Sequence, residues 1–124
     1  MDPIRKLPDA ELEVMQAVWA CPVPAARADI AAQLKREPPM APTTLLTLLT
    51  RLAEKGFLHI EKPDRSSRYI PLVSREEYLA QQSRRFLDQL CGGSIPTFAA
   101  ALCDSGISRE ELRQLRELLE RGAL

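Results

Sequence analysis

The 124-residue sequence predicts a mainly α-helical protein with one small β-hairpin. Apolar side chains recur at helical spacing along most of the chain. Two short runs rich in β-branched and aromatic residues interrupt this pattern between residues 57 and 73. Two identical Ser-Arg-Glu-Glu tetrads then begin at Ser74 and Ser108, where each indicates the start of a helix. Hydrophobic residues make up 45% of the chain and charged residues 27%, which is typical of a folded globular protein.

The first two helices are expected at residues 9–20 and 26–36. Asp9 is the N-cap candidate of the first helix, and apolar residues recur at helical spacing from Leu12 to Trp19. We expect Trp19 to lie in the core. Prolines end both helices. The buried face expected for the second helix consists of Ala28, Ile30, Ala31 and Leu34.

The third helix has the clearest pattern in the chain. Pro42 stands at its first position and Gly56 closes it. Leucines recur at i, i+3, i+4 and i+7, and this spacing predicts a buried stripe of Leu45, Leu48, Leu49 and Leu52. Residues 57–62 and 67–73 follow as the strands of a hairpin, with a buried Tyr69 in the second strand. Three helices and a hairpin in this order predict a winged helix-turn-helix domain over residues 1–73.

Residues 74–124 are predicted to be helical, with a short helix over 94–104 between the two that the tetrads open. These helices have apolar stripes but too few large apolar residues for a core of their own, so we expect 74–124 to be a dimerisation domain that pairs two copies. A tail folded back on the winged domain is the alternative. The dimerisation stripes consist of Leu79, Phe86, Leu87, Leu90, Leu112, Leu115, Leu118 and Leu119.

The polar face of the third helix has the residue types that read the major groove of double-stranded DNA. Base contacts are expected from Thr43, Thr44, Leu46 and Thr47, with Leu46 meeting a thymine methyl. Contacts to the DNA backbone are expected from Arg51, Lys62, Arg65 and Arg68. A solvated amphipathic helix with solubilising charges is the alternative, and the hairpin beside the helix favours the DNA-binding interpretation.

The charge of the chain leaves a second hypothesis open. The net charge is zero, whereas dedicated nucleic-acid binders usually have a basic excess. Residues 42–73 have five basic and three acidic side chains, a weak basic patch with a net charge of +2. A winged-helix module that binds another protein and no specific DNA is therefore the alternative function.

An enzyme is not expected. His59 is the only histidine and has no nucleophile near it in the sequence. The sequence therefore lacks the residues needed for general base catalysis by histidine and for a histidine-based metal site. No cofactor is expected. Cys21, Cys91 and Cys103 have no C-x-x-C spacing, which indicates buried free thiols; a thiol-based sensor with Cys91 and Cys103 is a further alternative. The chain has no run long enough for a signal peptide or a membrane helix, so we expect a cytoplasmic protein without membrane insertion.

Four segments are similar to a known family. They are LPDAELEVMQAVWA, MAPTTLLTLLTRLAEKGFL, SSRYIPLVSREEYL and FAAALCDSGISREELRQLRELL. Together they span nearly the whole chain, which resembles the penicillinase-repressor (BlaI/MecI/CopY) family of bacterial transcriptional regulators. The resemblance implies a repressor that binds a palindromic operator in double-stranded DNA as a homodimer, with base contacts at Thr43, Thr44 and Thr47.

The resemblance also implies a route of induction. In the family, a membrane metalloprotease sensor system leads to proteolysis of the dimerisation region, and the corresponding cleavage position here falls near Ala101 and Leu102. The Asn-Phe pair of the best-known members is absent at this position. Ala41 stands where a helix-capping serine is common in the family, and an alanine cannot accept the capping bond.

Overall fold

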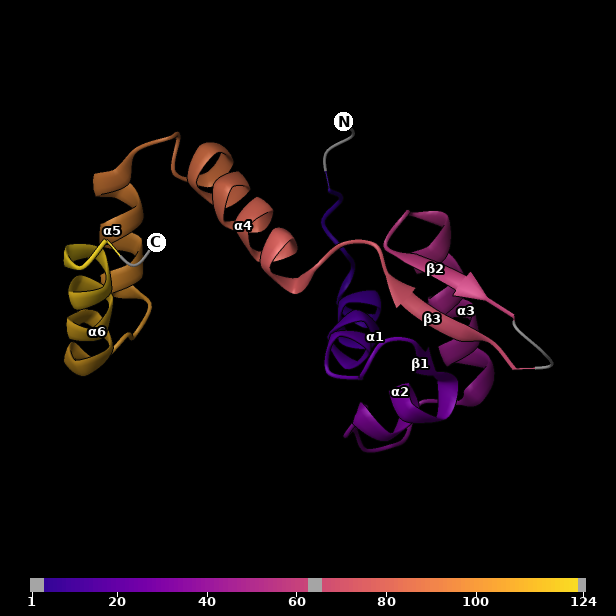
Figure 1. Cartoon of the computed structure of the whole chain (residues 1–124). Helices are drawn as coiled ribbons and strands as arrows, with labels where there is room; N and C mark the ends of the chain where they lie inside the picture. The colour runs from indigo at the N-terminus through magenta and orange to yellow at the C-terminus, as the bar shows by residue number, and fades with distance from the viewer. Residues whose placement is uncertain (1–3, 63–65, 123–124) are drawn as a thin grey trace. The chain divides into compact units, whose positions relative to one another are not determined.

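The computed structural model describes residues 4–62 and 66–122 (Figure 1). Contacts between residues divide the chain into two compact units, one ending at Gln82 and the other beginning at Ser83. In the described ranges, no helix has both the length and the apolar character needed to cross a membrane.

The first unit holds three complete helices, a small sheet and the start of a fourth helix. The helices are α1 (Asp9–Trp19), α2 (Arg27–Gln33) and α3 (Pro42–Glu54). The strands are β1 (Ala25–Ala26), β2 (Leu58–Glu61) and β3 (Arg68–Pro71). All pairings are antiparallel and the strand order is β1-β3-β2, so the predicted hairpin forms two strands of a three-stranded sheet.

The core of this unit lies between α1, α3 and the sheet. The leucine stripe of α3 is buried as predicted, and each leucine removed from water contributes about 2 kcal/mol. Tyr69 is buried as predicted, and Trp19 is half-buried and packs against the core. The largest fully buried side chains are Val14, Met15, Val18, Ile30, Leu49, Leu52, Phe57 and Tyr69.

The second helix is shorter than predicted. It spans Arg27–Gln33, and Ile30 is its one buried residue. Ala28 and Ala31, predicted to be buried, are exposed, while Leu34 lies beyond the helix and packs only partly against the core. A helix of only two turns has few positions on the side that faces the core, and in α2 Ile30 is the residue that occupies the core-facing position.

The predicted C-terminal helices are present. The helix that begins after Ser74 consists of α4 (Arg75–Arg85) and one turn of π-helix (Phe86–Leu90). It is followed by α5 (Ile95–Asp104) and α6 (Arg109–Glu120). Both predicted capping boxes form: Glu77 N donates to Ser74 Oγ at 3.0 Å, and Glu111 N donates to Ser108 Oγ at 3.1 Å.

Few side chains are buried in the second unit. Among its residues from Ser83 to Gly122, Cys91 alone is buried. Phe86 meets the ring of Phe98 from α5 edge-on, at a centroid distance of 5.7 Å. The expectation that all three cysteines are buried is wrong for Cys103, which is exposed because α5 has no covering element at that position in the described chain.

Candidate nucleic-acid interface

The exposed face of α3 presents the four residues expected to contact bases. Thr43, Thr44, Leu46 and Thr47, which we call the reading face, are all exposed while the leucine stripe on the opposite side is buried. Leu46 is 43% exposed, although it directly follows the buried Leu45. An apolar side chain held in water on this face is available for contact with a thymine methyl. Ala41 caps the helix without a side-chain bond, as expected.

The hydroxyl of Thr47 has a defined orientation. Its Oγ1 donates to the carbonyl oxygen of Thr43, one turn earlier, at 2.9 Å. Thr50 makes the same bond to the carbonyl of Leu46, also at 2.9 Å. Because the proton is used within the helix, the lone pairs of Thr47 Oγ1 point outward as acceptors. Such a hydroxyl suits the amino groups of adenine or cytosine in the major groove.

Arg51 lies beside the reading face. The three threonines of the reading face, Leu48 and Arg51 surround one shallow hollow on the surface of α3. Arg51 is exposed and stands two turns beyond Thr44 along the helix. The structure therefore brings one predicted backbone-binding side chain next to three predicted base-contacting side chains.

The hairpin of β2 and β3 and the turn between them, which we call the wing, contribute two described basic residues. Lys62 is exposed at the end of β2, and Arg68 begins β3. Arg68 Nη1 donates to Ser66 Oγ and to the carbonyl of Ser67, both at 3.2 Å, which orients the guanidinium. Arg65, the third predicted wing residue, lies outside the described residues.

A junction that the sequence analysis did not identify holds the start of α4 on the winged unit. Tyr78 is 4% exposed and its hydroxyl accepts a hydrogen bond from the backbone N–H of Leu7 at 2.9 Å. Its ring packs against Trp19 and Phe57, at centroid distances of 5.8 and 5.9 Å. Trp19 Nε1 donates to the carbonyl of Val73 at 2.9 Å. The signal in the sequence was an aromatic residue in the first turn of the helix that follows Ser74.

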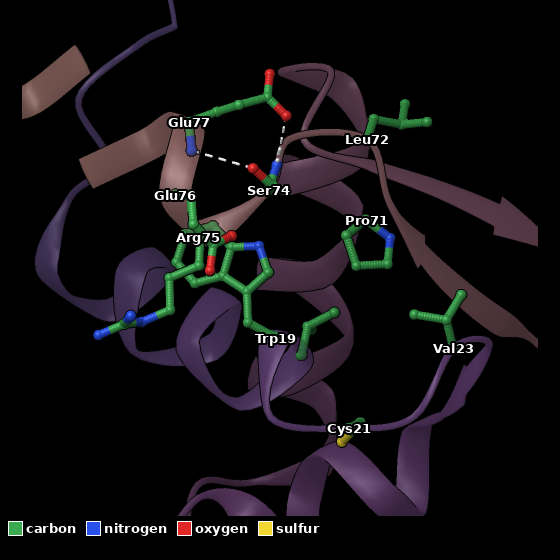
Figure 2. Close-up of a pocket in the computed structure, with 10 residues that line it drawn as sticks. Trp19, Cys21, Val23, Pro71, Leu72, Ser74, Arg75, Glu76 and Glu77 are labelled. Carbon is green, nitrogen blue, oxygen red and sulfur yellow. Dashed lines mark hydrogen bonds between the residues drawn. The ribbon is translucent and has the colours of Figure 1, made fainter. Parts of the chain in front are cut away.

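A hollow lies on the same unit, between the end of α1, the end of β3 and the first turn of α4. Figure 2 shows Trp19, Cys21 and Leu72 around it, together with the capping box of Ser74 and Glu77. Burial raises the pKa of the Cys21 thiol, and the nearby Asp29 raises it further. A thiol with a raised pKa is a poor nucleophile at neutral pH, which disfavours redox or covalent chemistry here.

The predicted dimerisation residues remain largely open to solvent in one copy of the chain. Leu79, Phe86, Leu90, Leu118 and Leu119 are between 39% and 75% exposed. The other three, Leu87, Leu112 and Leu115, are half-buried. Leu79 lies in the first unit, whereas the second unit presents apolar side chains in water from its π-helical turn and from α6.

The predicted cleavage region lies within a helix. Ala101 and Leu102 belong to α5, where Ala101 is exposed and Leu102 is half-buried. A protease binds its substrate as an extended strand, so cleavage at this position requires local unfolding of α5.

Comparison with known proteins gives consistent matches. A sequence model of the family described as "Penicillinase repressor" matches residues 7–121. The penicillinase repressor of Bacillus licheniformis is 29% identical over 121 residues, which cover 97% of this chain and 94% of that protein. The methicillin resistance regulatory protein MecI of Staphylococcus aureus (strain N315) is 26% identical over 117 residues, which cover 94% of each.

A solved structure has the same winged-helix fold. It is the solution structure of the Bacillus licheniformis BlaI monomeric form in complex with the blaP half-operator. The similarity has a TM-score of 0.50 and a sequence identity of 32%, and covers 63% of this chain and 94% of that chain.

Proposed function

Because the chain belongs to the penicillinase repressor family, we propose that it is a transcriptional repressor that binds double-stranded operator DNA. The observation that carries this proposal is the reading face of α3, whose hydroxyls and one leucine are exposed next to a wing with basic residues. A recognition helix enters the major groove with its N-terminal residues against base edges, and these four residues occupy the first two turns of α3. A similar BlaI chain was solved in complex with the blaP half-operator, which supports the binding of operator DNA.

The reading face and the basic side chains have different roles in this proposal. Thr44 and Thr47 contact base edges, Thr43 contacts a base or a phosphate, and Leu46 contacts a thymine methyl. Arg51, Lys62, Arg65 and Arg68 bind backbone phosphates, which set affinity and position but not sequence.

We place the functional division of the chain between residues 73 and 74, with residues 74–124 forming a homodimer. The exposed leucines of α4 and α6 support this part of the proposal, because a second copy would remove them from water. Two winged-helix domains, each with a weak basic patch, bind a palindromic operator more tightly when they are joined in a dimer. Once the first domain is bound, the second binds its half-site at a high effective concentration.

The dimerisation region, residues 74–124, is also the proposed site of regulation. Cleavage near Ala101 and Leu102, initiated by a membrane metalloprotease sensor system, would break the homodimer. The two winged-helix domains would then separate and release the operator, although the reading face is unaltered. The exposure of Ala101 supports access of a protease once α5 opens. The measurement is the appearance of fragments divided at this position in cells that receive the inducer, with a variant resistant at residues 101 and 102 as the control.

Binding to DNA can be tested directly. The purified chain is titrated with a duplex of its own upstream region and with a random duplex, each at several salt concentrations. We expect a preference for the upstream duplex of at least about a thousandfold, with affinity that falls as salt rises. Binding with neither sequence preference nor salt dependence would contradict the proposal and favour a winged-helix module that binds protein.

A further inference from the structure

A groove on the winged unit brings together two arginines that are far apart in the sequence. It lies between the start of α2, the N-terminal half of α3 and the beginning of β3. Arg27 and Arg68 both line it, together with the hydroxyl-bearing Ser66 and Ser67, and Leu46 of the reading face lines it from α3. The groove is therefore continuous with the reading face.

The short strand β1 fixes this arrangement. It pairs with β3 so that Ala26 lies opposite Arg68 and Ala25 opposite Tyr69. Arg27 directly follows the partner of Arg68, at the first position of α2. The pairing of β1 with β3 thus brings the backbones of Arg27 and Arg68 close together at one end of the sheet.

The charges around the groove leave the two guanidinium groups able to bind an anion. The carboxylate of Asp29 accepts a hydrogen bond from Ala26 N at 3.2 Å and so is occupied at the start of α2. Glu61 is opposite Arg68 across the β2–β3 pairing, and its carboxylate lies 3.8 Å from His59 Nε2. Over residues 4–62 and 66–122, neither Arg27 nor Arg68 has a carboxylate oxygen within 4.0 Å.

We infer that Arg27 binds a phosphate of the operator backbone and, with Arg68, holds the DNA strand that runs along this groove. The inference rests on the proposed DNA-binding function and adds a contact from α2 to those of the reading face and the wing. A planar guanidinium suits phosphate oxygens because it donates two parallel hydrogen bonds. The two serine hydroxyls at the same groove can donate to the same anion.

The test is a salt titration of operator binding by the full chain and by Arg27→Gln. Each phosphate contact contributes about 0.9 to the slope of log affinity against log salt, so loss of Arg27 from both protomers lowers the slope by about 1.8. We expect the affinity at low salt to fall by more than about tenfold, while the ratio between upstream and random duplex stays the same. Arg27→Lys keeps a point charge and should retain the wild-type slope.

Arg36→Gln is the matched control. It removes the same charge from an exposed arginine of the same region, but Arg36 pairs with Glu13 at 3.5 Å and does not line the groove. A slope for Arg27→Gln equal to that of Arg36→Gln would overturn the inference and leave the proposed function intact. Absence of salt-dependent binding by the wild-type chain would instead overturn the proposed function. Melting curves of both variants establish that each one is folded.

Discussion

The hydroxyl of Thr47 already has one hydrogen-bonding role within α3, and this limits what it can do on DNA. Its proton is donated to the carbonyl of Thr43, so only its lone pairs are available to a base. Thr50 makes the equivalent bond one turn further from the helix N-terminus. Position along α3, and not hydroxyl chemistry, is what distinguishes these two threonines.

Thr47→Val should therefore lower the discrimination between operator and random duplex by about fivefold, since valine keeps the shape of threonine and loses one acceptor worth about 1 kcal/mol. Thr50→Val removes the same helix bond and should leave discrimination unchanged. Competition binding with both duplexes at one salt concentration measures the two ratios. Equal losses in the two variants would show that the helix bond matters and the base contact does not.

A partly buried ion pair joins α1 to the C-cap residue of α3. Lys55 Nζ lies 2.5 Å from Glu11 Oε1, and the Glu11 side chain is 6% exposed. Glu11→Gln leaves the ammonium of Lys55 without its counter-charge in a partly desolvated site, which should cost about 2 kcal/mol of unfolding free energy. Glu13→Gln, on the same helix, removes an exposed partner of Arg36 and should cost less than about 0.5 kcal/mol. Urea unfolding of the two variants gives both values, and similar losses would contradict the prediction.

At the scale of elements, helices with strong periodicity were predictable and the short connecting elements were not. The four leucines of α3 determine its buried side because their spacing matches the helical repeat. Strand β1 consists of two alanines, which have no preference for a strand, and its pairing with β3 depends on residues far along the chain. For the same reason the sequence did not reveal Arg27 as a neighbour of Arg68, nor Tyr78 as part of the junction.

The junction predicts that Tyr78 stabilises the winged unit although it belongs to α4. Tyr78→Phe leaves the buried N–H of Leu7 without an acceptor and should lower the unfolding free energy by about 1–3 kcal/mol. Tyr78→Ala also removes the ring and should cost about 3–5 kcal/mol. Trp19 is the only tryptophan and touches Tyr78, so its fluorescence reports unfolding at the junction. Unchanged urea midpoints would contradict this role.

The capping box of α6 predicts a dependence on pH. Hydrogen bonds from the Ser108 backbone and hydroxyl lower the pKa of Glu111, and the bond from Arg113 lowers that of Glu110, both from an ordinary 4.5. Because folding lowers these values, the stabilisation is complete above pH 4.5 and is lost as the pH falls through the lower folded-state pKa. Circular dichroism during acid titration should show helix loss below 4.5, and the Glu110→Gln, Glu111→Gln double variant should have less helix at neutral pH and a weaker pH dependence.

For the whole molecule, the proposed homodimer predicts that affinity for the full operator depends on α6. Leu119 is 55% exposed in one copy, so Leu119→Glu should leave the fold of each copy intact and place a charge in the paired surface. Gln114→Glu adds the same charge to the same helix at an exposed polar position and is the control.

Sedimentation should show a monomer for Leu119→Glu and a dimer for Gln114→Glu and wild type. Binding to a full palindrome should weaken by about a hundredfold or more in Leu119→Glu, because the second module no longer binds at high effective concentration. Binding to a single half-site should be unchanged, since the reading face and the wing are untouched. A Leu119→Glu chain that is dimeric and binds the palindrome like wild type would exclude α6 from the dimer surface, and a monomeric variant with full affinity would show that pairing does not contribute to operator binding.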